Sequence, residues 1–518
     1  MKDSQRASNY AGVFIIKKPN IIFLMTDQQN WDCIGVLNPH IKTPNLDKLA
    51  KQGIIYNQAV AQCPMCVPSR NSMMFGMYPS QLGVRTNASV LYYEDKLPSL
   101  PLPEIMLKAG YQTAGFGKTH WCHGHINKEP PTRGFEVRAI GQSADSRCYE
   151  HGALMMGDEN PEGLNEYFEE TKDYGSGEEN ANGYIGCTSE VQVQNHRDGW
   201  VAQKCLEFLD EGIDPDRPLF LYLSFLKPHA GFNVPKEFED MYNVDDIPDL
   251  KFPEFEEENT HLSYIRDLNP KMRKTYEDRK EVISKLSERE KKRIQLRYWA
   301  NCTWLDNYFG LVLRKLEEKG RLDNCIILYT SDHGDMMGQR NYMYSKYCLY
   351  ENSIRVPLIL SGSIIPEEKR GMLDMRLAEL VDIVPTLSKI AGHSVNPMLP
   401  GLDLLGEEKR SGAFAEFHGG GNEQTQPSPA YMWRKERYKL IIYIPTTINN
   451  SSQSLENTKG ELYDLKNDPT EYNNLYYDNN YRDIREQLKT ELLMHLACAW
   501  AKAPFYYDSE GFSKILNS

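Results

Sequence analysis

Five short apolar runs, spaced far apart along the chain, constrain the fold more than any other feature. They are rich in β-branched or aromatic residues and cover Ile21–Met25, Thr113–Phe116, Leu219–Phe225, Cys325–Thr330 and Val356–Leu360. Near-continuous apolar strands are typical of a sheet that is buried on both faces, and the long stretches between them leave room for crossover helices. The pattern predicts an α/β fold with a large, mostly parallel sheet flanked by helices.

The clearest helix is predicted from about Glu288 to Lys319, directly before the fourth of these strands. Ser287 and Glu290 have the spacing of a capping box, and Gly320 lies where helices commonly end. Apolar residues recur there at alternating steps of four and three, at Tyr298, Cys302, Leu305, Phe309, Val312 and Leu316. Such a spacing predicts one apolar helix face that packs on the sheet.

The composition of the sequence changes after Pro400. Residues 419–429 have the character of a loop, whereas Tyr438–Tyr443 is typical of a strand and Arg482–Ala499 of a helix. We therefore predict a catalytic domain over residues 18–411 and a smaller C-terminal α+β subdomain over residues 412–518.

Net charge and apolar content exclude several classes of partner. Lys and Arg number 59 and Asp and Glu 72, which gives a net charge of −13 and argues against nucleic acid or an anionic membrane as partner. No apolar run reaches the roughly 20 residues of a membrane span. The run Ala11–Ile16 is shorter than the core of a signal peptide, so we expect a cytoplasmic protein, with an exported form that has lost its signal as the alternative.

Polar side chains that suit metal binding or catalysis follow directly after four of the predicted strands. These residues are Asp27 and Gln28 after the first strand, Lys118 and His120 after the second, His229 after the third, and Asp332 and His333 after the fourth. Ligands of open α/β sheets bind outside the carboxyl ends of the strands, so we expect these side chains to converge. The oxygen-rich set favours a hard cation, Ca²⁺ or Mg²⁺, over zinc.

The segment from Cys63 to Arg70 supports two interpretations. Cys63 and Cys66 have the spacing of a redox dithiol, which would make the protein a thiol–disulfide oxidoreductase. Cys66-Val67-Pro68-Ser69-Arg70 instead resembles the signature of the sulfatase family, in which a maturation enzyme oxidises the cysteine to formylglycine. A third reading, a catalytically silent binder of sulfated glycans, applies if Cys66 stays unconverted.

The resemblance to sulfatases continues, in the right order, over roughly residues 18–500. The matching blocks are Pro19-Asn20-Ile21-Ile22, Gly117-Lys118-Thr119-His120, Pro228-His229, Ser331-Asp332-His333-Gly334-Asp335, Lys346 with Tyr350-Glu351, Ile354-Arg355-Val356-Pro357 and Glu461-Leu462-Tyr463-Asp464-Leu465. The resemblance implies an alkaline-phosphatase-like fold and the hydrolysis of a small sulfate ester of a phenol, a steroid or a saccharide.

The resemblance also implies a role for each site residue. Asp27, Gln28, Cys66, Asp332 and His333 would hold one divalent cation, Ca²⁺ first, with Mg²⁺ or Mn²⁺ as alternatives. One hydroxyl of hydrated formylglycine attacks sulfur and displaces the alcohol, and loss of a proton from the other expels sulfate. His120 is implied as the base, Lys118 and Arg70 as the groups that hold residue 66, and His229 and Lys346 as sulfate contacts, one of which protonates the leaving oxygen.

Two positions depart from the pattern of many sulfatases. Gln28 stands where they carry a second Asp, and His333 stands where others have Asn. This combination also occurs in relatives that hydrolyse phosphonate monoesters or phosphodiesters, which keeps that activity as the alternative. The Pro68-Ser69-Arg70 core favours sulfate. Separately, His123 and His125 lack the second half of a zinc site and are expected to line the pocket beside His120.

Overall fold

The computed structural model describes the chain in segments. These are residues 17–89, 91, 97–121, 132–141, 152–171, 179–250, 253, 258–261, 263–264, 270–418, 429–444 and 459–501.

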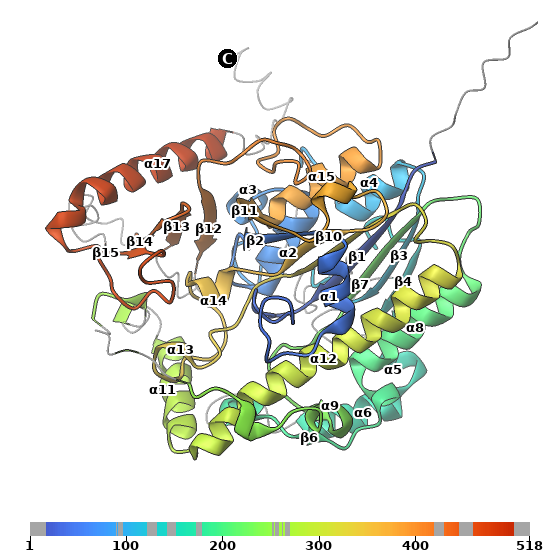
Figure 1. Cartoon of the computed structure of the whole chain (residues 1–518), viewed down its shortest axis with the longest axis horizontal. Helices are drawn as coiled ribbons and strands as arrows, with labels where there is room; N and C mark the ends of the chain where they lie inside the picture. Colours follow the sequence, from blue (N-terminus) through green and yellow to red (C-terminus); the bar gives the residue numbers. More distant parts are fainter. Residues whose placement is uncertain are drawn as a thin grey trace, which may run out of the picture.

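A nine-stranded sheet forms the centre of the molecule (Figure 1). Its order is β11-β2-β10-β9-β1-β7-β3-β4-β5, and every pairing is parallel except those of β10 with β2 and β9. The strands are β1 Asn20–Thr26, β2 Ile54–Val60, β3 Gln112–Gly117, β4 Val137–Ile140, β5 Leu154–Met155, β7 Leu219–Ser224, β9 Cys325–Ser331, β10 Leu358–Ser361 and β11 Met372–Glu379. The mostly parallel sheet is confirmed, and the fifth predicted strand is β10, which runs antiparallel.

Alternate side chains of the inner strands enter two different cores, as the period of a strand requires. In β1, Ile22 and Leu24 join a cluster with helices α1, α8 and α12, whereas Ile21 and Phe23 join a cluster with α2, α4 and α15. The sheet is thus a layer between two sets of helices (Figure 1). The helices are α1 Pro44–Lys51, α2 Cys66–Phe75, α3 Pro79–Leu82, α4 Leu102–Lys108, α5 Met156–Glu159, α6 Pro161–Thr171, α7 Glu179–Ile185, α8 Arg197–Glu211, α9 Lys236–Glu239, α11 Pro270–Ser284, α12 Glu288–Glu318, α13 Gln339–Tyr342, α14 Glu351–Ile354, α15 Ile383–Ile390 and α17 Arg482–Ala501.

The long helix α12 has the ends and the buried face that its sequence predicts. Ser287 and Glu290 form the capping box, and Gly320, with φ of 64°, follows the last turn. All six residues of the predicted apolar face are buried. This face fixes α12 against the sheet, directly before β9.

A second, antiparallel sheet follows the first along the chain. It consists of β12 Ala413–Phe417, β13 Ala430–Arg434, β14 Tyr438–Tyr443 and β15 Lys459–Asp464, in that order, and α17 packs on it (Figure 1). A separate pair joins β6 Thr188–Ser189 to β8 Val234–Pro235. The C-terminal part therefore has the predicted α+β character, while the boundary at residue 412 stays a prediction. Within the described segments, no helix combines the length and apolar character that crossing a membrane requires.

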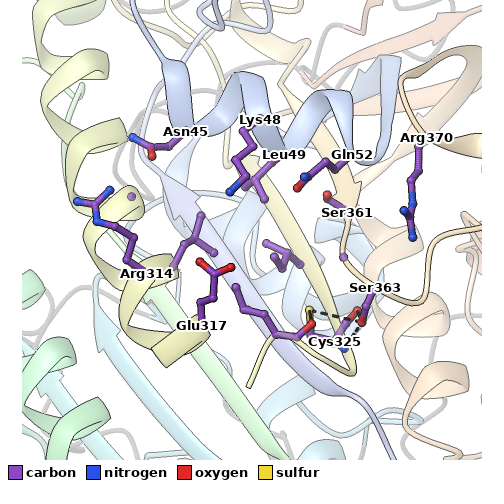
Figure 2. Close-up of a pocket in the computed structure, with 15 residues that line it drawn as sticks. Asn45, Lys48, Leu49, Gln52, Arg314, Glu317, Cys325, Ser361, Ser363 and Arg370 are labelled. Atoms are coloured by element: carbon purple, nitrogen blue, oxygen red, sulfur yellow. Dashed lines mark hydrogen bonds between the residues drawn. The ribbon is translucent and has the colours of Figure 1, made fainter. Parts of the chain in front are cut away.

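A cavity of about 570 Å³ lies between α1, α12 and the start of β9 (Figure 2). Lys48 and Glu317 line it, together with Cys325, the first residue of β9. Because β1 and β9 run parallel, Asp27 and Asp332 follow the opposite ends of these strands. The cavity therefore lies at the amino ends of these strands, and the predicted site lies at their carboxyl ends.

Candidate active site

The predicted site residues converge at the carboxyl edge of the central sheet. Thr26 of β1 is paired with Ser331 of β9, so Asp27 and Asp332 leave the sheet side by side. The helix α2 begins at Cys66, whose Sγ lies 3.3 Å from Nε2 of His333 and 4.0 Å from Oδ1 of Asp27.

Four of the five predicted metal ligands form one buried cluster. Ligand atoms of Asp27, Cys66, Asp332 and His333 all lie within 4.8 Å of one another. Arg70 occupies one oxygen of each carboxylate, with Nε 2.7 Å from Asp332 Oδ2 and Nη2 3.0 Å from Asp27 Oδ2. The Oδ1 atoms are thereby left for other partners, and Asp27 Oδ1 faces Cys66.

Two further atoms make this cluster suitable for a cation. Nδ1 of His333 lies 3.0 Å from the Gly334 carbonyl oxygen, which assigns the ring proton to Nδ1 and leaves Nε2 as a lone-pair donor. Oε1 of Gln28 is buried and accepts no hydrogen bond from the described residues. Gln28 adjoins the cluster, since its backbone N–H donates to Asp332 Oδ1 at 3.0 Å. Buried acceptors are rarely left unsatisfied, so Gln28 can add a third oxygen to the two carboxylates, one nitrogen and residue 66, a set that fits a divalent cation.

Positive charge surrounds the Cys66 side chain. Nζ of Lys346 lies 2.9 Å from Sγ, and Nζ of Lys118 lies 2.5 Å from Asp27 Oδ2. Burial alone would raise the pKa of Cys66, but Lys118, Lys346 and His333 outweigh it and hold that pKa well below its ordinary value. The pocket is therefore built to stabilise negative charge at residue 66.

Both predicted histidines reach the same side chain. Burial and then Lys118 lower the pKa of His120 to about 3, against a hydrogen bond with Cys66 that raises it. Burial and then Lys346 also lower the pKa of His229, which likewise interacts with Cys66. Each imidazole is neutral at pH 7 in this environment, and a neutral imidazole can accept a proton.

Several residues that support the site carry no recognisable motif. In β7, the Tyr222 hydroxyl donates to the Lys118 carbonyl oxygen at 2.9 Å, and Ser224 Oγ accepts from Arg70 Nη1 at 3.0 Å. Tyr298, which the sequence places on the apolar face of α12, donates its hydroxyl to the Gln28 carbonyl oxygen at 2.6 Å. Polar groups near the end of an apolar strand or on an apolar helix face are the signal that could have found them.

Of the two thiols in the redox-dithiol interpretation, Cys63 is unsuited to be the attacking one. Cys63 is fully buried, and burial together with Glu416 raises the pKa of its thiol well above the ordinary value. A thiol that resists ionisation is a poor nucleophile for disulfide exchange. His123 and His125 lie outside the described residues.

The chain matches two family models that together span most of its length. The Sulfatase model matches residues 19–393, and the model of the C-terminal part of N-sulphoglucosamine sulphohydrolase matches residues 339–497. An arylsulfatase of Clostridium perfringens is 30% identical, over 92% of this chain and 94% of the relative. An N-acetylglucosamine-6-O-sulfatase of Bacteroides thetaiotaomicron is 26% identical, over 91% of this chain and 85% of the relative.

The fold also resembles solved structures. The phosphonate monoester hydrolase of Agrobacterium radiobacter superposes with a TM-score of 0.70 at 21% identity, covering 93% of this chain and 96% of that structure. This likeness shows a shared fold.

Proposed function

The chain belongs to the sulfatase family and is a sulfuric ester hydrolase, and from this premise we propose that Cys66, converted to formylglycine by a maturation enzyme, is its nucleophilic residue. Cβ of Cys66 would become the aldehyde carbon, and its sulfur marks the position that the oxygen would take. Formylglycine supplies an oxygen nucleophile, so that ester cleavage proceeds in two steps through residue 66.

One observation carries this proposal: the Cys66 side chain is contacted by the Lys346 ammonium group, by His120 and His229, and by the cluster of possible metal ligands. Lys346 Nζ is 2.9 Å from its sulfur, and His333 Nε2 is 3.3 Å away. Positive groups fixed around a sulfate stabilise the charge that develops during its transfer, which is commonly the largest catalytic contribution.

We assign the cation to Asp27, Gln28, Asp332, His333 and residue 66. Ca²⁺ suits this oxygen-rich set best, and Mg²⁺ and Mn²⁺ are the alternatives. When bound, the cation polarises an oxygen at residue 66 and lowers its pKa. Arg70 keeps the two carboxylates in place from behind, since it bonds the Oδ2 atom of each.

The proton-transfer roles follow from position and charge state. His120, neutral and in contact with residue 66, accepts the proton from that residue after the ester bond is broken. Lys346 stays protonated, because Cys66 and Asp27 raise its pKa by more than burial lowers it, and it holds the sulfate. We assign proton donation to the leaving oxygen to His229, which would take up a proton from solvent when the sulfate anion binds beside it.

We propose a sulfated saccharide of small size, or the end of an oligosaccharide, as the substrate. The support is the N-acetylglucosamine-6-O-sulfatase relative and the C-terminal match to an N-sulphoglucosamine sulphohydrolase. The net charge of −13 opposes the approach of a long polyanion. A panel of sulfated sugars, phenols and steroids, with released sulfate as the readout, tests this, and faster turnover of steroid or simple phenol sulfates would contradict it.

A second candidate activity is phosphonate monoester or phosphodiester hydrolysis. Gln28 and His333 favour it, because they lower the negative charge around the metal relative to an Asp-Asp and Asp-Asn set. Parallel assays on p-nitrophenyl sulfate and a phenyl phosphonate ester separate the two. We expect a higher kcat/KM for the sulfate, and the reverse order would make the phosphorus ester the preferred substrate.

A further inference from the structure

We propose that Asp335 is a positioning residue that determines which end of the Gln28 carboxamide faces the metal site. The inference rests on the metal site proposed above. It assigns a role to a carboxylate that is not itself among the proposed ligands.

Both oxygens of Asp335 are engaged as acceptors. Oδ1 accepts from the backbone N–H groups of Met337 at 2.7 Å and Ser345 at 3.0 Å, and Oδ2 accepts from Nε2 of Gln28. The Asp335 side chain is completely buried, so no solvent competes for these bonds. The carboxylate therefore requires a donor from Gln28.

The bond to Asp335 determines the orientation of the Gln28 carboxamide. With its NH₂ group held by Asp335, Gln28 turns Oε1 the other way, and that oxygen has no partner among the described residues. The reverse orientation would press Oε1 against a carboxylate oxygen and turn two N–H donors toward the cation. Each of these contacts is repulsive, so Asp335 selects the only orientation in which Gln28 is a metal ligand.

The same carboxylate also holds the segment that leads to Lys346. Gln28 and Ser345 have φ angles of 67° and 83°, in the left-handed region that non-glycine residues avoid. Ser345 donates to Asp335 and directly precedes Lys346, whose Nζ reaches Cys66. The buried side chain of Asp335 thus connects Gln28 to the segment that carries Lys346.

An exchange of amide and carboxylate tests the proposal. In Asp335→Asn, the amide oxygen keeps the bonds from Met337 and Ser345, and the new NH₂ group faces that of Gln28. Gln28 must then turn its own NH₂ toward the cation, and we expect Ca²⁺ affinity to fall about 10- to 100-fold. Gln28→Glu added to Asp335→Asn supplies a carboxylate that accepts from the new amide and still offers an oxygen to the metal. This double variant should bind Ca²⁺ within a few-fold of the wild type.

Calorimetric titration with Ca²⁺, together with the Ca²⁺-induced shift in Tm, measures binding without any assay of activity. Asp306→Asn is the matched control, because Asp306 is a buried carboxylate that accepts from the backbone N–H of Leu46 at 2.7 Å, remote from the site. It should lower Tm and leave Ca²⁺ affinity unchanged.

The outcomes separate the two proposals. Unchanged affinity in Asp335→Asn, or no recovery in the double variant, overturns the positioning role while the metal site stands. If the wild type binds none of Ca²⁺, Mg²⁺ and Mn²⁺, the metal site falls and this inference falls with it. If Asp335→Asn fails to fold, recovery of folding and Ca²⁺ binding by the double variant supports the role, and failure of both variants to fold shows a purely structural one.

Discussion

This molecule has two buried clusters of charged residues: in one the charges are joined in ion pairs, and in the other possible metal-ligand atoms converge. In the cluster between α14 and the second sheet, Glu351 pairs with Arg434 at 2.9 Å and with Lys439 at 3.2 Å, and Lys439 pairs with Glu471 at 2.7 Å. Around Cys66, by contrast, the ligand atoms of four residues face one another across at most 4.8 Å. Both clusters bury charge, and the convergence of possible metal-ligand atoms is what leads us to propose the catalytic centre at Cys66.

The difference predicts that the two clusters fail in opposite ways. We expect the residues around Cys66 to contribute to turnover more than to the free energy of unfolding, so their removal should stop turnover and leave the protein folded. Residues of the Glu351 cluster form ion pairs that join α14 to the second sheet, so their removal should weaken the fold first.

The largest expected effect is on turnover, from Cys66→Ala. Loss of the nucleophilic residue should lower kcat by about 10⁴-fold or more, while Tm changes little because the side chain is small. In the active wild type, the peptide that contains residue 66 should be about 18 Da lighter than its thiol form, as conversion to the aldehyde requires. Substantial sulfate release by the variant would refute the role of residue 66.

Metal removal should come next. Because the cation supplies several kcal/mol of transition-state stabilisation, a chelator should lower kcat about 100-fold or more, and added Ca²⁺ should restore it. The fold should persist, with a loss of about 2.7 kcal/mol of stability if the cation had been present at 100 times its Kd. Turnover indifferent to chelation, with no metal detected in the protein, contradicts this assignment.

Glu351→Gln should reverse the pattern and lower stability before activity. Removing this charge leaves Arg434 buried without its carboxylate partner and leaves Lys439 with Glu471 alone, at a cost of about 3–5 kcal/mol in the free energy of unfolding. Denaturant titration measures this loss. Lys236→Ala is the control, since its ion pair with Asp240 is exposed and should be worth less than about 0.5 kcal/mol. A similar loss in both variants would mean that the buried cluster does not hold α14 to the second sheet.

The same variant carries a pH signature. Burial raises the pKa of Glu351, but Arg434, Lys439 and Arg355 outweigh it and hold the pKa below the ordinary value of 4.5. The stabilisation from this carboxylate is thus present above pH 4.5 and is lost as the pH falls through the lowered pKa. The difference in unfolding free energy between wild type and Glu351→Gln should narrow below pH 4.5, and a gap that widens there would contradict the pairing.

The sequence predicted the inner strands of the sheet better than its edges. Ile21–Met25 and Cys325–Thr330 are buried on both faces, and their continuous apolar runs match β1 and β9 to within one residue at each end. The strands β2 and β11 were missed. β2 carries the half-buried polar pair Asn57 and Gln58, and β11 lies at the sheet edge with charged and exposed residues, so neither has a continuous apolar run or a clean alternation.

The site shows a similar limit. Asp27 and Asp332 lie together, as predicted, because each follows a strand that ends at the same side of the sheet. Cys66 was grouped with them only through the family resemblance, since the strand before it was not predicted. Asp335 was visible in the same motif, yet its partner Gln28 is 307 positions away, and only the folded chain shows which of its atoms meet. Sequence therefore locates polar residues that follow strands, while the contacts that orient their side chains come from distant segments and appear only in the folded chain.

The effect of His229→Ala depends on the leaving group, and on an activated ester it is the smallest loss expected. A general acid contributes about 10²- to 10⁴-fold when the departing oxygen is basic, so the variant should lose that much on a sugar sulfate. An activated phenol departs with little protonation, and we expect a loss of about tenfold or less on p-nitrophenyl sulfate.

Comparison with Lys346→Met distinguishes the role of Lys346 from that of His229. Nζ of Lys346 lies 2.9 Å from the Cys66 sulfur and holds positive charge, so its removal should slow both substrates by a similar factor. The ratio of kcat/KM between the two esters thus distinguishes proton donation from charge stabilisation. If the ratio of kcat/KM between the esters is unchanged in His229→Ala and changed in Lys346→Met, the roles of the two residues are exchanged. The contrast between the two clusters would still hold, because neither of these substitutions should lower Tm as Glu351→Gln does.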